Sequence, residues 1–183
     1  YRTLFFMSKR DRVLGIMTDD IDENVDWVKT PLKIEYPFAI RQLDAYRNQT
    51  LAINELGQVL AWGEGYFADG TDSSTTITYP TVISGIDNPV AVSRGKNHNL
   101  VLDINGDVWG WGSNSNYPMG RGAGKIRTAS KLSGISNVQQ IAAGTEFSLF
   151  LKKDGTVWSV GVNTYGQLGL GDTERRLDPE RIP

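Results

Sequence analysis

The side chains best suited to bind a metal ion lie in one acidic segment near the start of the chain. Asp20, Asp22 and Asn24 have the spacing that begins a calcium-binding loop, in which alternate oxygen-bearing side chains surround the ion. The sixth position of such a loop requires glycine and the twelfth an acidic ligand, but Val25 and Pro31 stand there. We therefore predict a solvated loop without a metal site, and calcium binding by its three side chains stays an open alternative.

Residues for acid–base or nucleophilic chemistry are few, because the chain has one histidine and no cysteine. His98 stands 49 residues after Gln49 and 49 residues before Phe147. A repeat position that takes Gln, His and Phe in turn is predicted to be structural, and it supports no Ser–His–Asp arrangement. The glycine motif at 166–171 lacks the Lys-Ser/Thr pair of a phosphate-binding loop. We therefore predict that the chain is not an enzyme, has no catalytic residues and binds no cofactor.

Charge and hydrophobicity narrow the classes of partner. The chain has 19 Lys and Arg against 21 Asp and Glu, a formal net charge of -2, so nucleic-acid binding through bulk charge is not expected. No segment approaches the roughly 20 apolar residues of a membrane span. No leader segment is visible and the first residue is not Met, so we expect a mature, trimmed or cloned piece. Basic clusters at 9–12 (a hairpin tip), 125–131 (a loop) and 175–176 are interpreted as solvated surface, and contact with phosphate or with an acidic partner stays an open alternative.

The elements that must position any functional residue are set by a repeat. The blocks 51–63, 100–112 and 149–161 align without a gap at a spacing of 49 residues. Each block reads as a β-hairpin, and Asn105-Gly106 and Asp154-Gly155 predict two-residue type I′ turns. The recurring structural residues are the turn glycines and the tryptophans of the second strand: Gly57, Gly106, Gly155, Trp62, Trp109, Trp111 and Trp158.

The second strand of each hairpin alternates bulky and small side chains. Trp109 and Trp111 point to one face, whereas Val108, Gly110 and Gly112 point to the other. Sheets of this kind can stack with a tryptophan of one sheet against a glycine of the next, as in a β-propeller, where each blade packs on its neighbours. The sequence therefore predicts an all-β fold, a propeller or part of one, made of four-stranded antiparallel blades.

A fourth, divergent copy of the repeat precedes the other three. With a shift of 46 residues, Phe5 and Met7 correspond to Leu51 and Ile53, and Gly15 takes the small position of the second strand. The chain then holds about 3.75 repeats in one domain, with a partial blade at 1–39 and blades at 40–89, 90–137 and 138–183.

The segment 161–172, Gly-Val-Asn-Thr-Tyr-Gly-Gln-Leu-Gly-Leu-Gly-Asp, resembles the signature of the regulator-of-chromosome-condensation repeat. The preceding segments 141–144 and 154–158 fit the same consensus in order, and the resemblance covers about 40–183 well. It implies a propeller, and the family usually closes a ring of seven blades. We therefore expect a second copy, or a missing segment of the same protein, to complete the ring.

The resemblance favours a non-catalytic scaffold that binds another protein through loops at the blade edges. Aromatic residues stand where the family consensus is replaced or in its exposed turns, and we predict that Tyr66, Phe67, Tyr117 and Tyr165 bind a partner. Met119 aligns with Leu168 and is predicted to plug the blade interior. Three alternatives stay open: an inhibitor of a secreted bacterial hydrolase, a guanine nucleotide exchange factor, and an adhesive domain of a bacterial surface protein. The compartment is open, with a bacterial extracellular or cell-surface location favoured.

Overall fold

The structure is a computed structural model that describes residues 37–47, 49–63, 76–122 and 124–183. It also describes the backbone of three short strands, β1 (Leu4–Met7), β2 (Val13–Ile16) and β3 (Leu32–Lys33). All regular elements of the described residues are β-strands, and none of these residues forms a helix that could span a membrane. The prediction of an all-β fold is confirmed.

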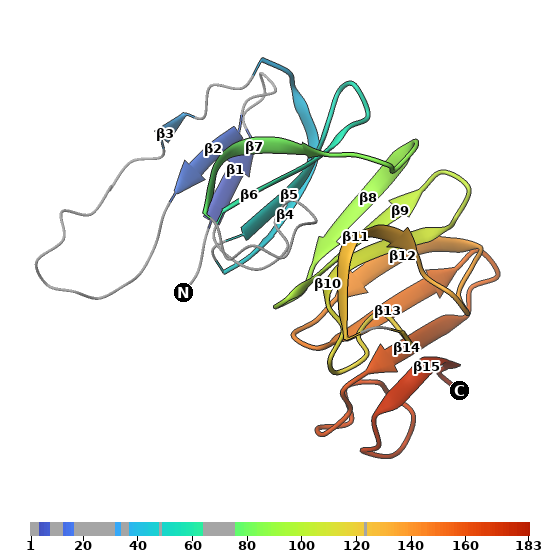
Figure 1. Ribbon diagram of the computed structural model, residues 1–183. Coiled ribbons are helices and arrows are strands. Elements are labelled where there is room, and N and C mark those ends of the chain that lie inside the picture. Colours follow the sequence, from blue (N-terminus) through green and yellow to red (C-terminus); the bar gives the residue numbers. More distant parts are fainter. Residues whose placement is uncertain are drawn as a thin grey trace, which may run out of the picture.

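Three four-stranded antiparallel sheets follow one another along the chain (Figure 1). The first contains β4 (Ile40–Tyr46), β5 (Gln49–Asn54), β6 (Val59–Gly63) and β7 (Ile77–Ile83). The second contains β8 (Pro89–Arg94), β9 (His98–Asp103), β10 (Val108–Ser113) and β11 (Lys125–Lys131). The third contains β12 (Val138–Ala143), β13 (Phe147–Lys152), β14 (Val157–Gly161) and β15 (Arg176–Arg181). In each sheet the strands pair in chain order, as in a propeller blade.

The β1–β2–β3 sheet follows the same register as the later blades. Phe5 pairs with Gly15 and Met7 with Val13, as Leu51 pairs with Ala61 and Ile53 with Val59. The backbone thus confirms that the divergent first repeat forms a hairpin with the predicted alignment.

The hairpin turns differ from the predicted type. Asn105 and Asp154 do not have positive φ, whereas Gly106 (φ 87°) and Gly155 (φ 84°) do. Gly106 N donates to Asp103 O, and Asp103 N donates to Asp107 O, so the loop has three residues: a type I turn followed by a left-handed glycine. The prediction of two-residue type I′ turns was therefore wrong. Leu56, at the position of Asn105, was the contrary signal, because a large side chain disfavours the positive φ that a type I′ turn needs.

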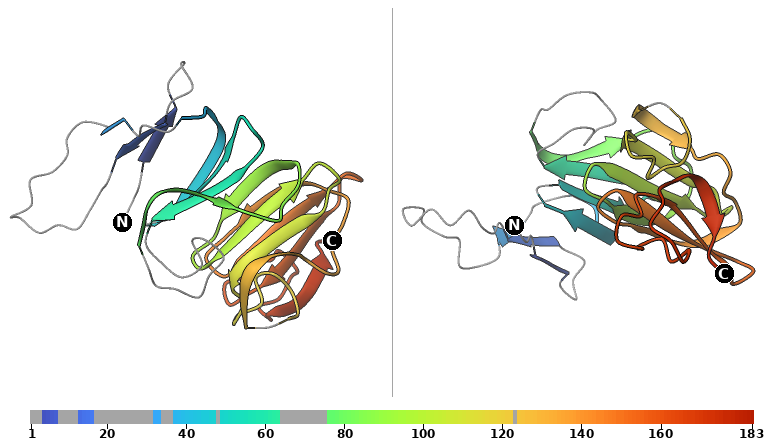
Figure 2. Two further views of the ribbon diagram at one scale, coloured as in Figure 1. Left: turned by 45° about the horizontal axis from the view of Figure 1, so that its top comes forward. Right: turned by 90° about the horizontal axis from the view of Figure 1, so that it is seen from below.

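The sheets stack on one another (Figure 2). The bulky face of one sheet packs on the small face of its neighbour. Trp111 is fully buried in a cluster with Leu51, Ile53 and Ala61 of the preceding sheet. In the same way Phe150 and Val160 pack on the face of the second sheet that carries Leu100, Leu102 and Val108. The predicted stacking is confirmed, and one hydrophobic cluster joins the first sheet to the second while another joins the second to the third.

The space above Gly110 is filled by side chains of its own repeat, from the segments that follow β10 and β11. A Cβ at this glycine would lie 2.7 Å from Met119 Sδ and 3.0 Å from Leu132 Cδ2. Met119 is 3% exposed, so the prediction that it plugs the blade is confirmed. The finer expectation that a tryptophan of the neighbouring sheet covers the glycine was wrong at Gly110.

Polar side chains link the innermost strands of successive sheets. Asp44 Oδ2 accepts hydrogen bonds from Arg94 N (2.8 Å) and Ser93 Oγ (3.2 Å), and Ser93 Oγ in turn accepts from Ala143 N (3.0 Å). Burial lowers the pKa of Arg94 to about 9, and the Asp44 charge opposes this effect. These hydrogen bonds fix how far each innermost strand is shifted along its neighbour.

Candidate partner-binding face

Two kinds of loop meet on one face of the stacked sheets, which we call the loop face. It comprises the turns 95–97 and 144–146, which follow the innermost strands, and the loops 114–122 and 162–175, which follow the third strands. Asn116 Nδ2 donates to Glu146 Oε2 (3.0 Å), and Lys96 Nζ lies 3.9 Å from Glu146 Oε1. The turn and loop segments of two sheets are therefore tied into one surface.

Each of the two loops is organised by a buried asparagine. Asn114 Oδ1 accepts from Met119 N (3.0 Å), and its Nδ2 donates to Gly120 O (2.9 Å). Asn163 Oδ1 likewise accepts from Leu168 N (2.9 Å), and its Nδ2 donates to Asp172 O (3.0 Å). Because buried loop backbone must find partners, these side chains hold both loops in nearly the same shape.

Tyr117 has a backbone conformation that its side chain disfavours. Its φ is 60°, and the residue at the same position of the third repeat is Gly166, with φ 72°. The two turns share their hydrogen bonds: Tyr117 N donates to Asn114 O, as Gly166 N donates to Asn163 O. A left-handed conformation costs an ordinary residue roughly 1–2 kcal/mol. The loop thus keeps a tyrosine where the equivalent loop uses glycine.

The Tyr117 ring is covered by a residue of the next sheet. The Arg175 guanidinium lies over it, with Cζ 5.3 Å from the ring centroid. Beside this pair, Arg121 makes two-pronged contact with Asp178, the closest at 2.9 Å between Nη2 and Oδ2. The loop of the second sheet is therefore joined to the outer strand β15 of the third.

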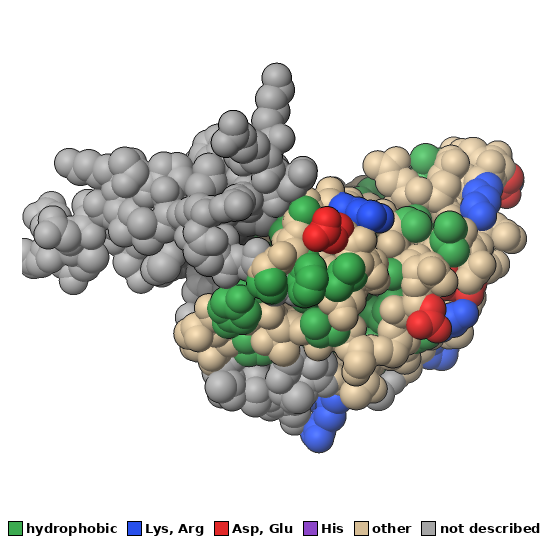
Figure 3. All heavy atoms as spheres, turned by 90° about the horizontal axis from the view of Figure 1, so that it is seen from above, with side chains coloured by type: hydrophobic (Ala, Val, Ile, Leu, Met, Phe, Trp, Pro, Cys, Tyr) green, Lys and Arg blue, Asp and Glu red, His purple; other side chains and the backbone are tan. Residues whose placement is uncertain are grey.

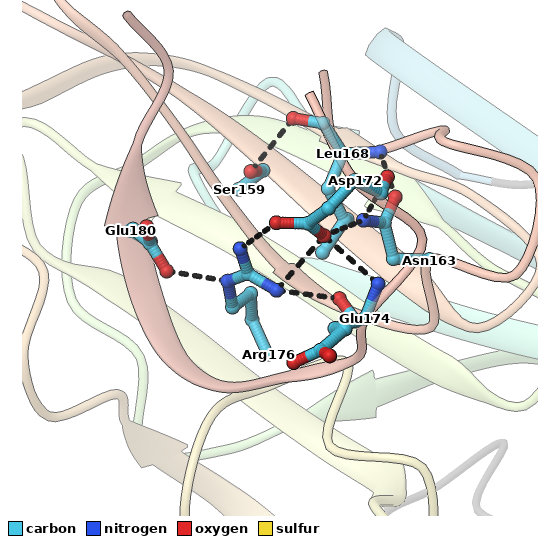
Figure 4. A network of polar contacts seen from close by, with 7 residues as sticks. All are labelled: Ser159, Asn163, Leu168, Asp172, Glu174, Arg176 and Glu180. Carbon is cyan, nitrogen blue, oxygen red and sulfur yellow. Dashed lines mark hydrogen bonds and ion pairs between the residues drawn. The ribbon is translucent and has the colours of Figure 1, made fainter. Parts of the chain in front are cut away.

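A charged network shapes the start of β15 and the loop before it (Figure 4). Arg176 contacts the carboxylates of Asp172 and Glu180 and the carbonyl oxygen of Glu174. The hydrogen bond from Arg176 is the main cause that lowers the pKa of Asp172. With its donors occupied in this way, Arg176 orders the loop 172–176 rather than offering a free charge.

Of the four predicted partner-binding residues, the structure describes Tyr117 and Tyr165, and these two differ in exposure. Tyr165 is 91% exposed at the tip of the loop 162–175, and Tyr117 is half-buried. Tyr66 and Phe67 lie outside the described residues, as do Asp20, Asp22 and Asn24. Within the described ranges, no group of three or more His, Asp or Glu side chains is arranged to hold a metal ion.

His98 is buried where two sheets meet, which fits a structural role. It is 1% exposed, its Nε2 lies 3.1 Å from Ser148 Oγ, and Ser148 Oγ donates to Pro118 O (2.6 Å). Burial, followed by the charge of Arg94, lowers the pKa of His98 to about 3. The imidazole is therefore neutral at physiological pH.

The basic cluster predicted in a loop is in fact on a strand. Lys125, Arg127 and Lys131 lie on β11, the outer strand of the second sheet. Lys131 Nζ is 2.6 Å from Asp107 Oδ2 and also lies over the Trp109 ring. Figure 3 shows one face of the molecule, on which acidic and basic side chains are interspersed and no histidine is visible. That face carries no large patch of one sign.

The sequence marked Arg175 as one of a basic pair, but its contact with Tyr117 was missed. Its contact with Tyr117 joins loops of two sheets, so no local pattern indicates it. A signal for Tyr117 was present, because it occupies the position of a glycine that the third repeat keeps at Gly166.

Comparison with known proteins gives a consistent picture. Two models of the family described as regulator of chromosome condensation (RCC1) repeat match the chain, one at 90–117 and 138–167, the other at 105–151 and 154–183. Together they span 90–183, just over half of the chain. No curated protein matches it.

Several solved structures share the fold. Human WBSCR16 aligns with 99% of this chain over 50% of its own length, at 21% identity and a TM-score of 0.80. Yeast RCC1 (Prp20), in a complex with Kap60, aligns with 99% over 46% of its length, at 19% identity and a TM-score of 0.84. Prp20p from Saccharomyces cerevisiae, described with its binding properties to Gsp1p and histones, aligns with 99% over 61%, at 18% identity and a TM-score of 0.65. The chain spans about half the length of the first two, and identities this low establish the fold alone.

Proposed function

Because the chain belongs to the regulator-of-chromosome-condensation (RCC1) repeat family, we propose that it is a non-catalytic scaffold that binds another protein through its loop face. The rigid part is the stack of sheets, whose clusters bury Trp111, Phe150 and Leu100 completely. Loops on a rigid scaffold commonly carry binding function. Protein binding is also what the names of two structural neighbours describe, since Prp20 is seen with Kap60 and is described with Gsp1p and histones.

The observation that carries the proposal is the left-handed tyrosine at 117. Strained backbone persists where the surrounding structure enforces it, and such strain clusters at functional sites. Here the loop is held by Asn114, and the equivalent loop shows that glycine satisfies the same geometry. Packing alone does not require the tyrosine, so we attribute it to recognition. Tyr165, 91% exposed, supplies a second aromatic side chain on the same face.

Selection of binding peptides tests this role. A random dodecapeptide phage library is selected on the wild-type protein, and each enriched peptide is measured against Tyr117→Gly, Tyr165→Ser and a control, Tyr79→Ser. Tyr79 is 53% exposed on the outer strand β7, so it matches the loss of an exposed tyrosine at another place.

We expect most enriched peptides to lose about tenfold or more in affinity with either loop variant and to bind the control like wild type. Peptides that bind all four proteins equally would refute the loop face as the binding surface. Melting temperatures of the variants separate lost binding from lost folding.

A second surface of the proposed scaffold is the open face of the third sheet. Leu100, Leu102 and Val108 are 0%, 3% and 1% exposed beneath the third sheet. The corresponding positions of the third sheet are Leu149 and Leu151, both half-buried, and Val157, which is 36% exposed. This difference supports the proposal that a further bulky-faced sheet, from a second copy or from the same protein, covers them. A monomeric mass in light scattering, with cooperative melting, would contradict a second copy.

The alternative functions are separable by assay. If the protein accelerates nucleotide release from a GTPase, it is an exchange factor rather than a non-catalytic scaffold. A tight one-to-one complex with a secreted hydrolase would indicate an inhibitor. An adhesive domain should do neither. No feature of the described loops favours one of these over the scaffold.

A further inference from the structure

Arg175 is an exposed cation whose position is set by an aromatic ring. Its guanidinium lies over the Tyr117 ring, with Cζ 5.3 Å from the ring centroid, which is the distance of a cation–π contact. A guanidinium presents its N–H donors as a planar fork that matches a carboxylate in a two-pronged geometry. The contact with the ring reduces the conformational entropy that Arg175 would lose on binding.

The other cations around Arg175 are already paired. Arg176 is held by Asp172 and Glu180, and Arg121 by Asp178. On the inner side of the face, Lys96 lies beside Glu146. These pairs leave their arginine and lysine donors engaged within the protein.

Arg175 itself has no carboxylate within ion-pair distance among the described residues. Glu174 precedes it in the sequence and is also exposed, yet the two side chains form no salt bridge. Arg175 is therefore an unpaired guanidinium between paired neighbours.

The tyrosine ring under Arg175 also carries a hydroxyl donor. No described group accepts a hydrogen bond from the Tyr117 hydroxyl, and a phenol can donate to a carboxylate. Arg175 and the tyrosine that it covers thus offer two kinds of donor to a carboxylate.

We propose that Arg175, held over the Tyr117 ring, anchors an aspartate or glutamate side chain of the partner, so that the loop face binds acidic protein segments. This inference rests on the proposed function, because it states which chemistry the loop face recognises. Charge pairs of this kind at an interface contribute specificity as well as affinity.

The test uses the peptides selected from the random dodecapeptide library on the wild-type protein. Their Asp and Glu content is compared with the unselected library, and their affinity is measured against Arg175→Gln, Arg175→Lys and the control Arg181→Gln. Arg181 is an exposed arginine at the last position of β15, the strand that begins directly after Arg175, so this control removes an equal charge.

We expect an excess of acidic residues, a loss of about tenfold or more with Arg175→Gln, a smaller loss with Arg175→Lys, and no loss with Arg181→Gln. A peptide with Gln in place of its key acidic residue should bind wild type about as weakly as the parent peptide binds Arg175→Gln. Peptides that depend on Tyr117 but lack acidic residues, or ignore Arg175→Gln, overturn the inference and leave the proposed function intact. Tighter binding of a phosphoserine peptide than of its glutamate counterpart also overturns it, in favour of phosphate recognition. Enriched peptides that depend on neither Tyr117 nor Tyr165 refute the proposed function as well.

Discussion

The protonation of His98 should make the fold sensitive to acid. The ring is 1% exposed and packs between two sheets, with Nε2 bonded to Ser148 Oγ. Because the Ser148 hydroxyl donates to Pro118 O, the ring nitrogen donates to the serine, which a neutral imidazole with its proton on Nε2 satisfies. A proton on the second nitrogen would add a charge that burial and the nearby Arg94 both disfavour.

The size of the effect follows from proton linkage. The pKa of His98 falls from 6.5 to about 3 on folding, so between these values the unfolded chain binds a proton that the folded protein does not. Stability therefore rises with pH through this window and falls by about 1.4 kcal/mol for each pH unit of acidification. Between pH 7 and pH 5 the expected loss from this one group is about 2 kcal/mol.

The assay compares wild type with His98→Gln. Glutamine is neutral at both pH values, can donate to Ser148, and already stands at the equivalent position 49. Urea unfolding is followed by tryptophan fluorescence at pH 7 and pH 5. Carboxylates contribute to both proteins alike, so the difference between the two pH dependences isolates His98. Equal losses of stability in the two proteins would refute the reasoning, because His98 would then titrate alike in both states.

Other substitutions test packing and loop order. Gly161→Ala should lower the free energy of unfolding by several kcal/mol, because the new Cβ would lie 2.5 Å from Glu146 O at φ 108°. Gly155→Ala, with nothing within 4 Å of the new Cβ, should lower it by about 1 kcal/mol. Chemical denaturation measures both, and similar losses would contradict the close approach at Gly161. Asn163→Ala should cost about 2–3 kcal/mol by leaving buried backbone groups of its loop unpaired, and a neutral result would show that water replaces the side chain. Tyr117→Gly should change stability by less than about 1 kcal/mol, since relief of backbone strain offsets the lost stack with Arg175; a large loss would assign the tyrosine to packing. Phe67→Ala, outside the described residues, should weaken partner binding and leave the melting temperature nearly unchanged.

The blade architecture was predictable because its signal is periodic. Alternation of bulky and small side chains in 108–112 determines which face each residue occupies, and the 49-residue spacing places the next sheet to receive it. The burial of Met119 was likewise predictable from its alignment with Leu168.

The turn type was misread for a local reason. Asn-Gly and Asp-Gly fit both a two-residue turn and a three-residue turn with a left-handed glycine, and the strand register decides between them. The register places Asp103 opposite Asp107, which leaves three residues in the loop.

The amino-acid sequence by itself determined the repeat, the hairpins and the identity of the residues that fill each sheet, because these depend on neighbours along a strand. Only the tertiary structure decided that Arg175 covers Tyr117 and that Arg121 binds Asp178. Both contacts join residues of different repeats, separated by 58 and 57 positions in the chain. Their formation depends on how far one sheet is rotated against the next, and packing of the whole hydrophobic face sets that rotation.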